Sequence, residues 1–204
     1  ITPVQANLRY PASVAPAVRD SDVVINLVGI LFERGRQCFD AVQTVGAEAV
    51  ALAASARGAR LIHVSAIGAD ENSPSAYARA KARGEKLVLA AVPGATYELG
   101  GPEVLTFKQL MEFVLATIER KRLLVPVPFF AAKVKAGFLQ FMPKPLLTPD
   151  QVELLRSDNV VSAEAAANGL TLAGLGITPR SVEDIVPTYL WRFRKTGQFQ
   201  GRVA

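Results

Sequence analysis

Three polar residues in the first half of the chain have the types and the spacing that acid/base chemistry requires. Ser65 follows an apolar run, and Tyr77 and Lys81 come twelve and sixteen residues after it. A tyrosine hydroxyl has a pKa of about 10 in water, so acid/base work at neutral pH needs a nearby cation that favours the phenolate. Lys81 lies four residues after Tyr77, on the same face of a helix, and can be that cation. The pattern predicts that Ser65 orients a substrate carbonyl or alcohol beside Tyr77.

The surrounding sequence predicts the elements that would position these residues. Strands are expected at residues 4–8, 22–28 and 61–65, and helices at residues 13–19, 37–57 and 75–91. Such alternation indicates an α/β fold with a doubly wound, Rossmann-like parallel sheet, which binds ligands at the carboxyl ends of its strands. Ser65 falls at such an end. Three strands leave open edges and uncovered apolar faces, so we expect further elements outside these residues.

Composition indicates a globular protein without a metal centre. Half of the 204 residues are hydrophobic, enough for a sizeable core. The single cysteine, Cys38, permits no internal disulfide, and the single histidine, His63, lies inside an apolar run. We interpret both as packing residues. The longest apolar run, residues 23–32, is far shorter than the roughly twenty residues that cross a bilayer.

The charge pattern argues against nucleic-acid binding. The formal net charge of +5 is spread along the chain and forms no basic stripe. A mild attraction to anionic lipid or to an acidic partner is compatible with it. Arg34 and Arg36 invite assignment to a cofactor phosphate, but we expect them to be solvated loop residues.

The second half predicts a smaller, mostly helical lobe suited to contact. Thr106 is the expected N-cap of a helix at residues 107–120. An apolar stripe with lysines at its edge follows, made of Phe130, Val134, Phe138 and Phe141 with Lys133, Lys135 and Lys144. This stripe fits a partner groove or the interfacial layer of a membrane, or else it covers the core of its own lobe. Residues 189–195 alternate rings and cations, either as an anchor or as a frayed basic end.

Longer motifs support a family resemblance over nearly the whole chain. Residues 23–85 contain V-V-I-N-L-V-G, H-V-S-A-I-G-A-D and S-A-Y-A-R-A-K-A-R-G-E-K, and resemble the extended and atypical short-chain dehydrogenase/reductases. Later motifs are Y-E-L-G-G-P-E-V-L-T-F, L-L-T-P-D-Q-V-E-L-L, D-N-V-V-S, L-G-I-T-P and P-T-Y-L-W-R-F-R. They narrow the resemblance to the nucleotide-binding accessory subunit of respiratory complex I and its bacterial relatives.

Two departures from that family pattern affect the expected domains. The chain has no G-x-G-x-x-G or G-x-x-G-x-x-G loop for the cofactor pyrophosphate. The family would also place a further strand and a long segment at Pro93 and Gly94. We therefore expect an N-terminal βαβ unit and a segment at 93/94 to be absent from this sequence. Residues 1–93 would form a partial dinucleotide-binding domain, and residues 94–204 the contact lobe.

The resemblance assigns cofactor contacts to seven positions. These are Asn7 and Leu8 near the adenine, Val28 and Gly29 beside the ribose, and Ser65, Tyr77 and Lys81 on the nicotinamide side. Asn7 has the alternative of a plain turn, and Gly29 that of a bend after a strand. The relatives favour NADP(H) as the cofactor, with NAD(H) as the alternative.

Two functions follow from the resemblance. The first is a non-catalytic accessory subunit of proton-pumping NADH:quinone oxidoreductase, peripheral on the cytoplasmic face of a bacterial inner membrane or the matrix side of the mitochondrial one. It would dock near the junction of the hydrophilic arm and the membrane, with other complex I subunits as partners and residues 129–144 and 189–195 as possible membrane contacts. The second is an active NAD(P)-dependent short-chain reductase or nucleotide-sugar epimerase, with Ser65, Tyr77 and Lys81 as its catalytic residues.

Overall fold

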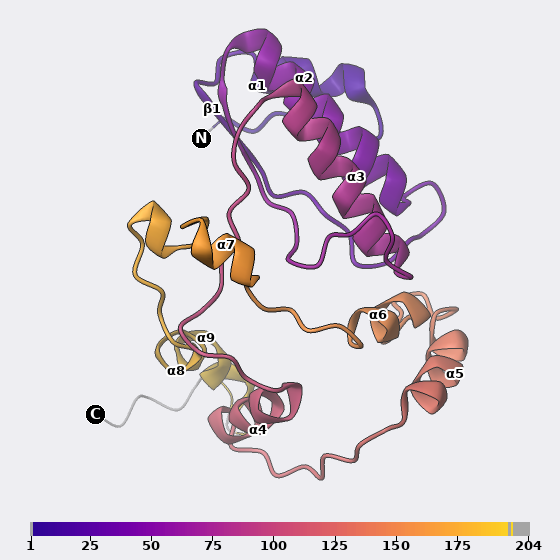
Figure 1. The fold of residues 1–204 in the computed structure, drawn as a ribbon. Coiled ribbons are helices and arrows are strands. Elements are labelled where there is room, and N and C mark those ends of the chain that lie inside the picture. Colours follow the sequence, from indigo (N-terminus) through magenta and orange to yellow (C-terminus); the bar gives the residue numbers. More distant parts are fainter. Residues whose placement is uncertain (1, 196, 198–204) are drawn as a thin grey trace. The chain divides into compact units, whose positions relative to one another are not determined.

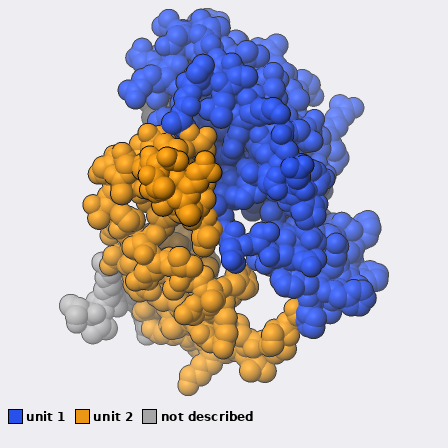
Figure 2. Space-filling view, viewed as in Figure 1, with its two compact units in different colours: residues 1–95, 128–159 blue, residues 96–127, 160–204 orange. Residues whose placement is uncertain are grey.

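The protein divides into two compact units (Figure 2). The computed structural model describes residues 2–195 and 197. Unit 1 contains residues 1–95 and 128–159, and unit 2 contains residues 96–127 and 160–204. The segment 128–159 thus groups with the first half of the chain, whereas the division expected from the sequence lies at residue 93. The Asp150 carboxylate accepts hydrogen bonds from the start of a helix in the first half and so joins the two segments of unit 1.

Unit 1 is a mixed α/β structure with a small parallel sheet. Strands β1 (Val23–Asn26) and β2 (Arg60–His63) pair in parallel, with Asn26 opposite His63. Both correspond to expected strands. The strand expected at residues 4–8 is wrong, because these residues find no partner strand and run instead into a turn that the Tyr10 N–H closes on the Asn7 carbonyl at 2.8 Å. The described residues therefore contain two of the three expected strands.

The first three α-helices of unit 1 lie close to the expected residues 13–19, 37–57 and 75–91, and two further helices follow for which no bounds were expected. They are α1 (Val14–Val18), α2 (Gly46–Arg57), α3 (Ala76–Ala91), α5 (Phe129–Leu139) and α6 (Pro149–Leu154). A π-helical stretch, Asp40–Val45, leads directly into α2. Gly58 ends α2 in the left-handed conformation with φ 72°, and Ser75 caps α3 by accepting the Ala78 N–H.

Helices cover one face of the two-stranded sheet. In β1, Val24 and Asn26 are buried, whereas Val23 and Ile25 are 46% and 59% exposed. Helix α2 packs on both strands, and α2 and α3 lie side by side (Figure 1). The main core cluster consists of Val14, Val18, Val24, Ala49, Val50, Ala54 and Ala59. The opposite face of β1 and β2 is left apolar and exposed, as expected for a sheet that lacks neighbours.

Close packing of α3 depends on one glycine. A Cβ atom at Gly84 would overlap the backbone carbonyl oxygen of Gln43, which lies in the π-helical stretch. Only a residue without a side chain allows the two segments to come so near. Thr44, next to Gln43, also donates its hydroxyl to the Ala80 carbonyl at 3.0 Å. These contacts fix the face of α3 that carries Lys81.

Unit 2 is small and helical. Its helices are α4 (Phe107–Thr117), α7 (Ala163–Ala167), α8 (Val182–Ile185) and α9 (Pro187–Leu190). The expected cap of α4 is confirmed, because Thr106 and Gln109 form a reciprocal capping box. Arg194 donates to the Thr117 carbonyl at 3.0 Å, and Arg120 donates to the Phe193 carbonyl at 3.2 Å. Residues 191–194 are thereby held against the end of α4.

None of the helices described in residues 2–195 and 197 combines the length and the apolar character that crossing a membrane requires.

Candidate functional site

The carboxyl ends of β1 and β2 and the first turns of α3 bring the predicted nicotinamide-side residues into one region. Ser65 lies two residues after β2, and Gly29 three residues after β1. Because the strands are parallel, both positions fall at the same edge of the sheet. Helix α3 begins after Ser75, so Tyr77 lies in its first turn and Lys81 in its second.

Lys81 is the centre of this region. Its side chain is 5% exposed, and its ammonium group donates to the Val64 carbonyl at 3.3 Å. A Cβ atom at Gly29 would lie 3.6 Å from the ammonium nitrogen, so Lys81 reaches from α3 to the ends of both strands. Burial lowers the pKa of Lys81, and the Glu85 carboxylate opposes part of that change.

Tyr77 is arranged differently from the catalytic expectation. Its half-buried ring meets the ring of Phe39 edge to face, with 5.7 Å between ring centres. Burial raises the pKa of Tyr77, which disfavours the phenolate. The Lys81 ammonium group donates one hydrogen bond to the Val64 carbonyl, and its expected effect on the Tyr77 phenolate stays a prediction. The two residues therefore lie on the same helix, and their catalytic role stays a prediction.

Three buried polar atoms in this region have no hydrogen-bond partner among the described residues. They are Ser65 Oγ, His63 Nε2 and Gln43 Nε2. Buried polar groups are rarely left unpaired, so a cluster of them indicates a place for a ligand or water. Since Asn26 Oδ1 accepts the Val28 N–H, the Asn26 amide nitrogen donates to His63 Nδ1 at 3.0 Å. The proton of the neutral imidazole then lies on the unpaired Nε2.

Gln43 was not singled out by the sequence. Its side chain is 2% exposed, and its carbonyl oxygen accepts the Ile30 N–H at 3.3 Å. A Cβ atom at Gly29 would lie 3.5 Å from that oxygen. Gln43 therefore fixes the backbone after β1 and leaves its amide nitrogen free beside it. A polar residue among the alanines and valines of residues 41–54 was the only available signal.

The other predicted cofactor positions have local roles. Asn7 accepts the Arg9 N–H on its side chain and takes the Ser13 hydroxyl on its backbone, which is the turn that we gave as its alternative. Leu8 packs against the main core cluster and approaches Gly46 at the start of α2. Val28 is 47% exposed beside Gly29. Val28 and Gly29 thus lie near Lys81. Leu8 instead lies near the start of α2, and Asn7 forms the turn beside it.

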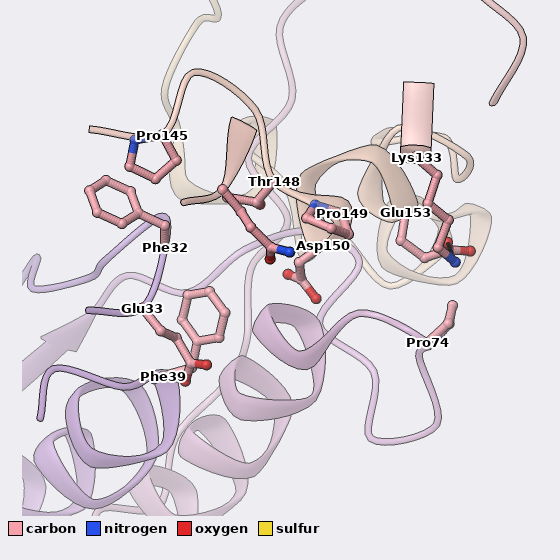
Figure 3. A pocket seen from close by; sticks show the side chains of 11 residues that line it. Phe32, Glu33, Phe39, Pro74, Lys133, Pro145, Thr148, Pro149, Asp150 and Glu153 are labelled. Atoms are coloured by element: carbon pink, nitrogen blue, oxygen red, sulfur yellow. Dashed lines mark hydrogen bonds and ion pairs between the residues drawn. The ribbon is translucent and has the colours of Figure 1, made fainter. Parts of the chain in front are cut away.

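A cavity of about 430 Å³ lies near the start of α3 within unit 1 (Figure 3). Phe32 and Phe39 form part of its wall, with Lys133, Asp150 and Glu153 among the charged lining residues. The lining carboxylates of Asp150 and Glu153 already have partners, because Asp150 binds the start of α3 and Glu153 pairs with Lys133 at 3.2 Å. The charged wall therefore serves the internal cohesion of unit 1.

The contact surfaces predicted in the second half are exposed. Phe130, Phe138 and Phe141 are 81%, 76% and 82% exposed. Within the described residues of unit 1, these rings therefore cover no core. Within residues 189–195, Tyr189 and Phe193 are also exposed, although Arg194 is bound to α4. Arg34 and Arg36 are exposed loop residues, as expected.

Comparison with known proteins connects this architecture to respiratory complex I. No protein-family model matches the chain. NADH dehydrogenase (ubiquinone) 1 alpha subcomplex subunit 9 of Arabidopsis thaliana is 27% identical over 272 positions, which cover 97% of this chain and 67% of the plant protein. The NADH-ubiquinone oxidoreductase 40 kDa subunit of Neurospora crassa is 26% identical over 96% of this chain and 68% of the fungal protein. The chain is a homologue of these complex I subunits.

The complex I homologues differ from this chain in length within the matched region. The alignment with the Arabidopsis subunit has 272 positions against the 204 residues of the chain, so the plant protein carries internal residues without a counterpart here. Pro93 and Gly94 are where we expect such a difference. A shorter match, with 39% identity over 92 residues, links 45% of this chain to 29% of the ceramide reductase of Caulobacter vibrioides.

Proposed function

We propose that this protein is an accessory subunit of NADH:quinone oxidoreductase, with other subunits of that complex as its partners. The observation that carries the proposal is the match to the Arabidopsis subunit, which extends over 97% of this chain and therefore through both units. The exposed aromatic rings of α5 support it, because large exposed apolar groups mark contact sites. The protein would lie peripherally on the cytoplasmic or matrix side of the membrane.

The sheet edge would hold a nicotinamide cofactor as a structural element. Lys81, Ser65 and the backbone at Gly29 fit the hydroxyl and amide groups of a nicotinamide riboside, because they offer one ammonium group, one unpaired hydroxyl and an open backbone. Bound cofactor would supply hydride chemistry, and burial raises the pKa of Tyr77, which disfavours its phenolate. A ligand bound only by the folded protein stabilises the fold by mass action. The resemblance favours NADP(H) over NAD(H).

The parallel pair of β1 and β2 would belong to a doubly wound sheet. Its uncovered face carries Val23, Ile25 and Ile62, which are 46%, 59% and 53% exposed. Parallel sheets are normally covered by helices on both faces. Additional strands and helices of the kind that the relatives' greater length allows would cover this surface.

Residues 129–144 and 189–195 are the proposed contacts with a partner subunit or with the membrane surface. On α5, Lys133 and Lys135 lie near exposed phenylalanines, the combination that suits the interfacial layer. Residues 189–195 add Tyr189, Phe193 and Lys195.

Association is tested by purification from the native host. A tagged copy of the protein, extracted with a mild detergent, should migrate on a native gel with NADH:quinone reductase activity. Migration of all the protein as a free monomer, at native expression, would refute the subunit assignment.

Cofactor binding is tested on the purified chain by fluorescence titration with NADPH. Lys81→Met should weaken binding at least about tenfold, since a charge-assisted hydrogen bond is removed. Lys86→Met is the matched control, because Lys86 lies on the same helix, is exposed and pairs with Glu71 at 3.3 Å. Equal affinities for the two variants would remove Lys81 from the cofactor site.

A second candidate function is an NAD(P)-dependent reductase. The observation that favours it is the match to the Caulobacter ceramide reductase, which is more identical to this chain than the complex I subunits are, although over a shorter length. In that function Tyr77 would transfer the proton and Ser65 would orient the substrate. Tyr77→Phe should then abolish turnover of a long-chain amide or ketone, and unchanged turnover would exclude Tyr77 from catalysis.

A further inference from the structure

Asp150 joins the second half of the chain to the helix that carries Tyr77 and Lys81. Its carboxylate accepts the Ala76 N–H at 2.6 Å, the Tyr77 N–H at 3.3 Å and the Ser75 hydroxyl at 2.9 Å. Ser75 is 1% exposed and accepts the Ala78 N–H at 3.2 Å. The first three N–H groups of α3 are thus satisfied by one residue within the helix cap and one residue over seventy positions later.

The start of α6, which carries Asp150, is also held in one conformation. Thr148 caps α6 through a reciprocal capping box with Gln151, and Pro149 occupies the first turn. Gln151 additionally donates its side-chain amide to the Leu31 carbonyl at 3.4 Å. Asp150 is therefore presented to α3 by a turn with little conformational freedom. Figure 3 shows its carboxylate below Pro149, beside the end of a helix.

Contacts continue from α6 to α5. The two helices pack together, and Glu153 on α6, with a side chain only 13% exposed, binds Lys133 on α5 at 3.2 Å. Glu153 also binds Arg156 at 3.3 Å, and the Arg156 guanidinium lies over the ring of Phe129. Helix α6 is thus joined to the start of α3 by the hydrogen bonds of Asp150 and to α5 by the ion pair of Glu153 with Lys133.

Among these contacts, we expect those of Asp150 to contribute most to the stability of unit 1. A carboxylate at the amino end of a helix is stabilised by the helix dipole as well as by its hydrogen bonds. Ser75 is buried, so loss of Asp150 would leave its hydroxyl proton without that acceptor, and unpaired buried polar groups are costly. Two further hydrogen bonds are described between residues 1–95 and residues 128–159 of unit 1. Gln151 donates to the Leu31 carbonyl and Arg34 donates to the Pro143 carbonyl, each at 3.4 Å.

We propose that Asp150 is a positioning residue that couples occupancy of the Lys81 site to the order of the α5 surface. This inference rests on the proposed function, in which a bound nicotinamide cofactor stiffens a docking surface. Cofactor held at Lys81 restrains α3, α3 holds Asp150 through its first N–H groups, and Asp150 holds α6 and with it α5. The partner-binding face is then presented in one arrangement only when the cofactor site is filled.

The test compares backbone hydrogen exchange of the full chain with and without NADPH. Without ligand, Asp150→Ala should speed exchange about tenfold both at residues 76–78 and in α5, as expected for a lost N-cap that opens a local unit. Asp150→Asn keeps one acceptor oxygen but loses the charge, so its effect should be intermediate. Asp158→Asn is the matched control, because Asp158 is an exposed carboxylate in the loop after α6.

NADPH provides the readout that a purely structural role would not affect. In the wild type, NADPH should slow exchange in both α3 and α5. In Asp150→Ala, the slowing should persist in α3 and disappear in α5. If Asp150→Ala does not fold, Asp150→Asn and Ser75→Ala replace it, and the ligand effect on α5 should be reduced in both.

The possible results distinguish a failure of the coupling through Asp150 from a failure of cofactor binding. Faster exchange at residues 76–78 with unchanged α5 would make Asp150 only a local cap and overturn the coupling. NADPH protection of α5 that survives in Asp150→Ala would overturn it as well. A wild type that binds no NADPH would refute the cofactor part of the proposed function, and the coupling to ligand with it, while the link between Asp150 and α5 is decided by the ligand-free comparison.

Discussion

Helices α3 and α5 belong to the same unit but differ in which side chains they bury and which they expose. Four of the five buried residues of α3 are small or polar, namely Ala78, Ala80, Lys81 and Gly84, and the fifth is Val88. In α5 the large rings are exposed, and Ala136 is its one buried residue. Helix α3 is therefore packed closely against its neighbours, so that its polar groups have fixed positions. Helix α5 instead presents an apolar surface that the rest of unit 1 does not cover.

The largest expected effect comes from adding one methyl group to each helix. Gly84→Ala should lower the free energy of unfolding by about 3 kcal/mol, because the new Cβ overlaps the Gln43 carbonyl oxygen. Gly137→Ala in α5 is the matched control, since a Cβ there meets nothing within 4 Å. It should stabilise the helix by about 0.5 kcal/mol or more. Urea denaturation of both variants measures the difference.

The difference in packing between α3 and α5 would be contradicted if the two substitutions changed the free energy of unfolding by similar amounts. A loss below about 1 kcal/mol for Gly84→Ala would mean that α3 moves away from Gln43 without penalty. Lys81 would then not be held in a fixed position, and the preformed site would lose its basis.

The next effect concerns the buried polar cluster beside α3. Burial, and then the Lys81 charge, lower the pKa of His63 below its usual 6.5. Between the lowered pKa and 6.5 the unfolded chain binds more protons than the folded chain, so stability is lost as the pH falls through this window. The loss has an upper limit of about 1.4 kcal/mol per pH unit. Urea denaturation between pH 7.5 and pH 5.5 measures it.

His63→Gln isolates this effect, because the chain contains no other histidine. The variant should show a nearly constant free energy of unfolding from pH 7.5 to pH 5.5. A wild type that gains stability on acidification would mean that the imidazole is stabilised in its charged form, contrary to its position beside the Lys81 ammonium group.

The sequence predicts what depends on neighbouring residues and misses what depends on distant ones. The start of α3 at Ser75, the end of α2 at Gly58 and the cap of α4 at Thr106 follow from short-range rules, and all are confirmed. The shared sheet edge of Ser65 and Gly29 follows from parallel strands. The strand expected at residues 4–8 is wrong, because an alternation of apolar and polar residues becomes a strand only beside another strand.

The missed features all join separate parts of the chain. Gly84 looks like an ordinary helix glycine until Gln43 is placed against it. Asp150 looks like a helix-start residue of α6, and nothing near it in the sequence indicates that its carboxylate serves α3. The raised pKa of Tyr77 depends on burial of its side chain, to which Phe39 from a separate segment contributes an edge-to-face ring contact.

The smallest expected effect on stability is on the exposed face of α5. Phe130→Ser and Phe138→Ser should each change the free energy of unfolding by less than about 0.5 kcal/mol, because rings that are 81% and 76% exposed lose little burial. The same substitutions should greatly reduce co-migration with NADH:quinone reductase activity on a native gel, since central apolar anchors dominate most interfaces. Lys108→Ser in α4, an exposed position paired only with Glu112 along its own helix, is the control. A loss of more than about 2 kcal/mol in the phenylalanine variants, with assembly unchanged, would mean that these rings stabilise the chain itself, and the contrast between α3 and α5 would then disappear.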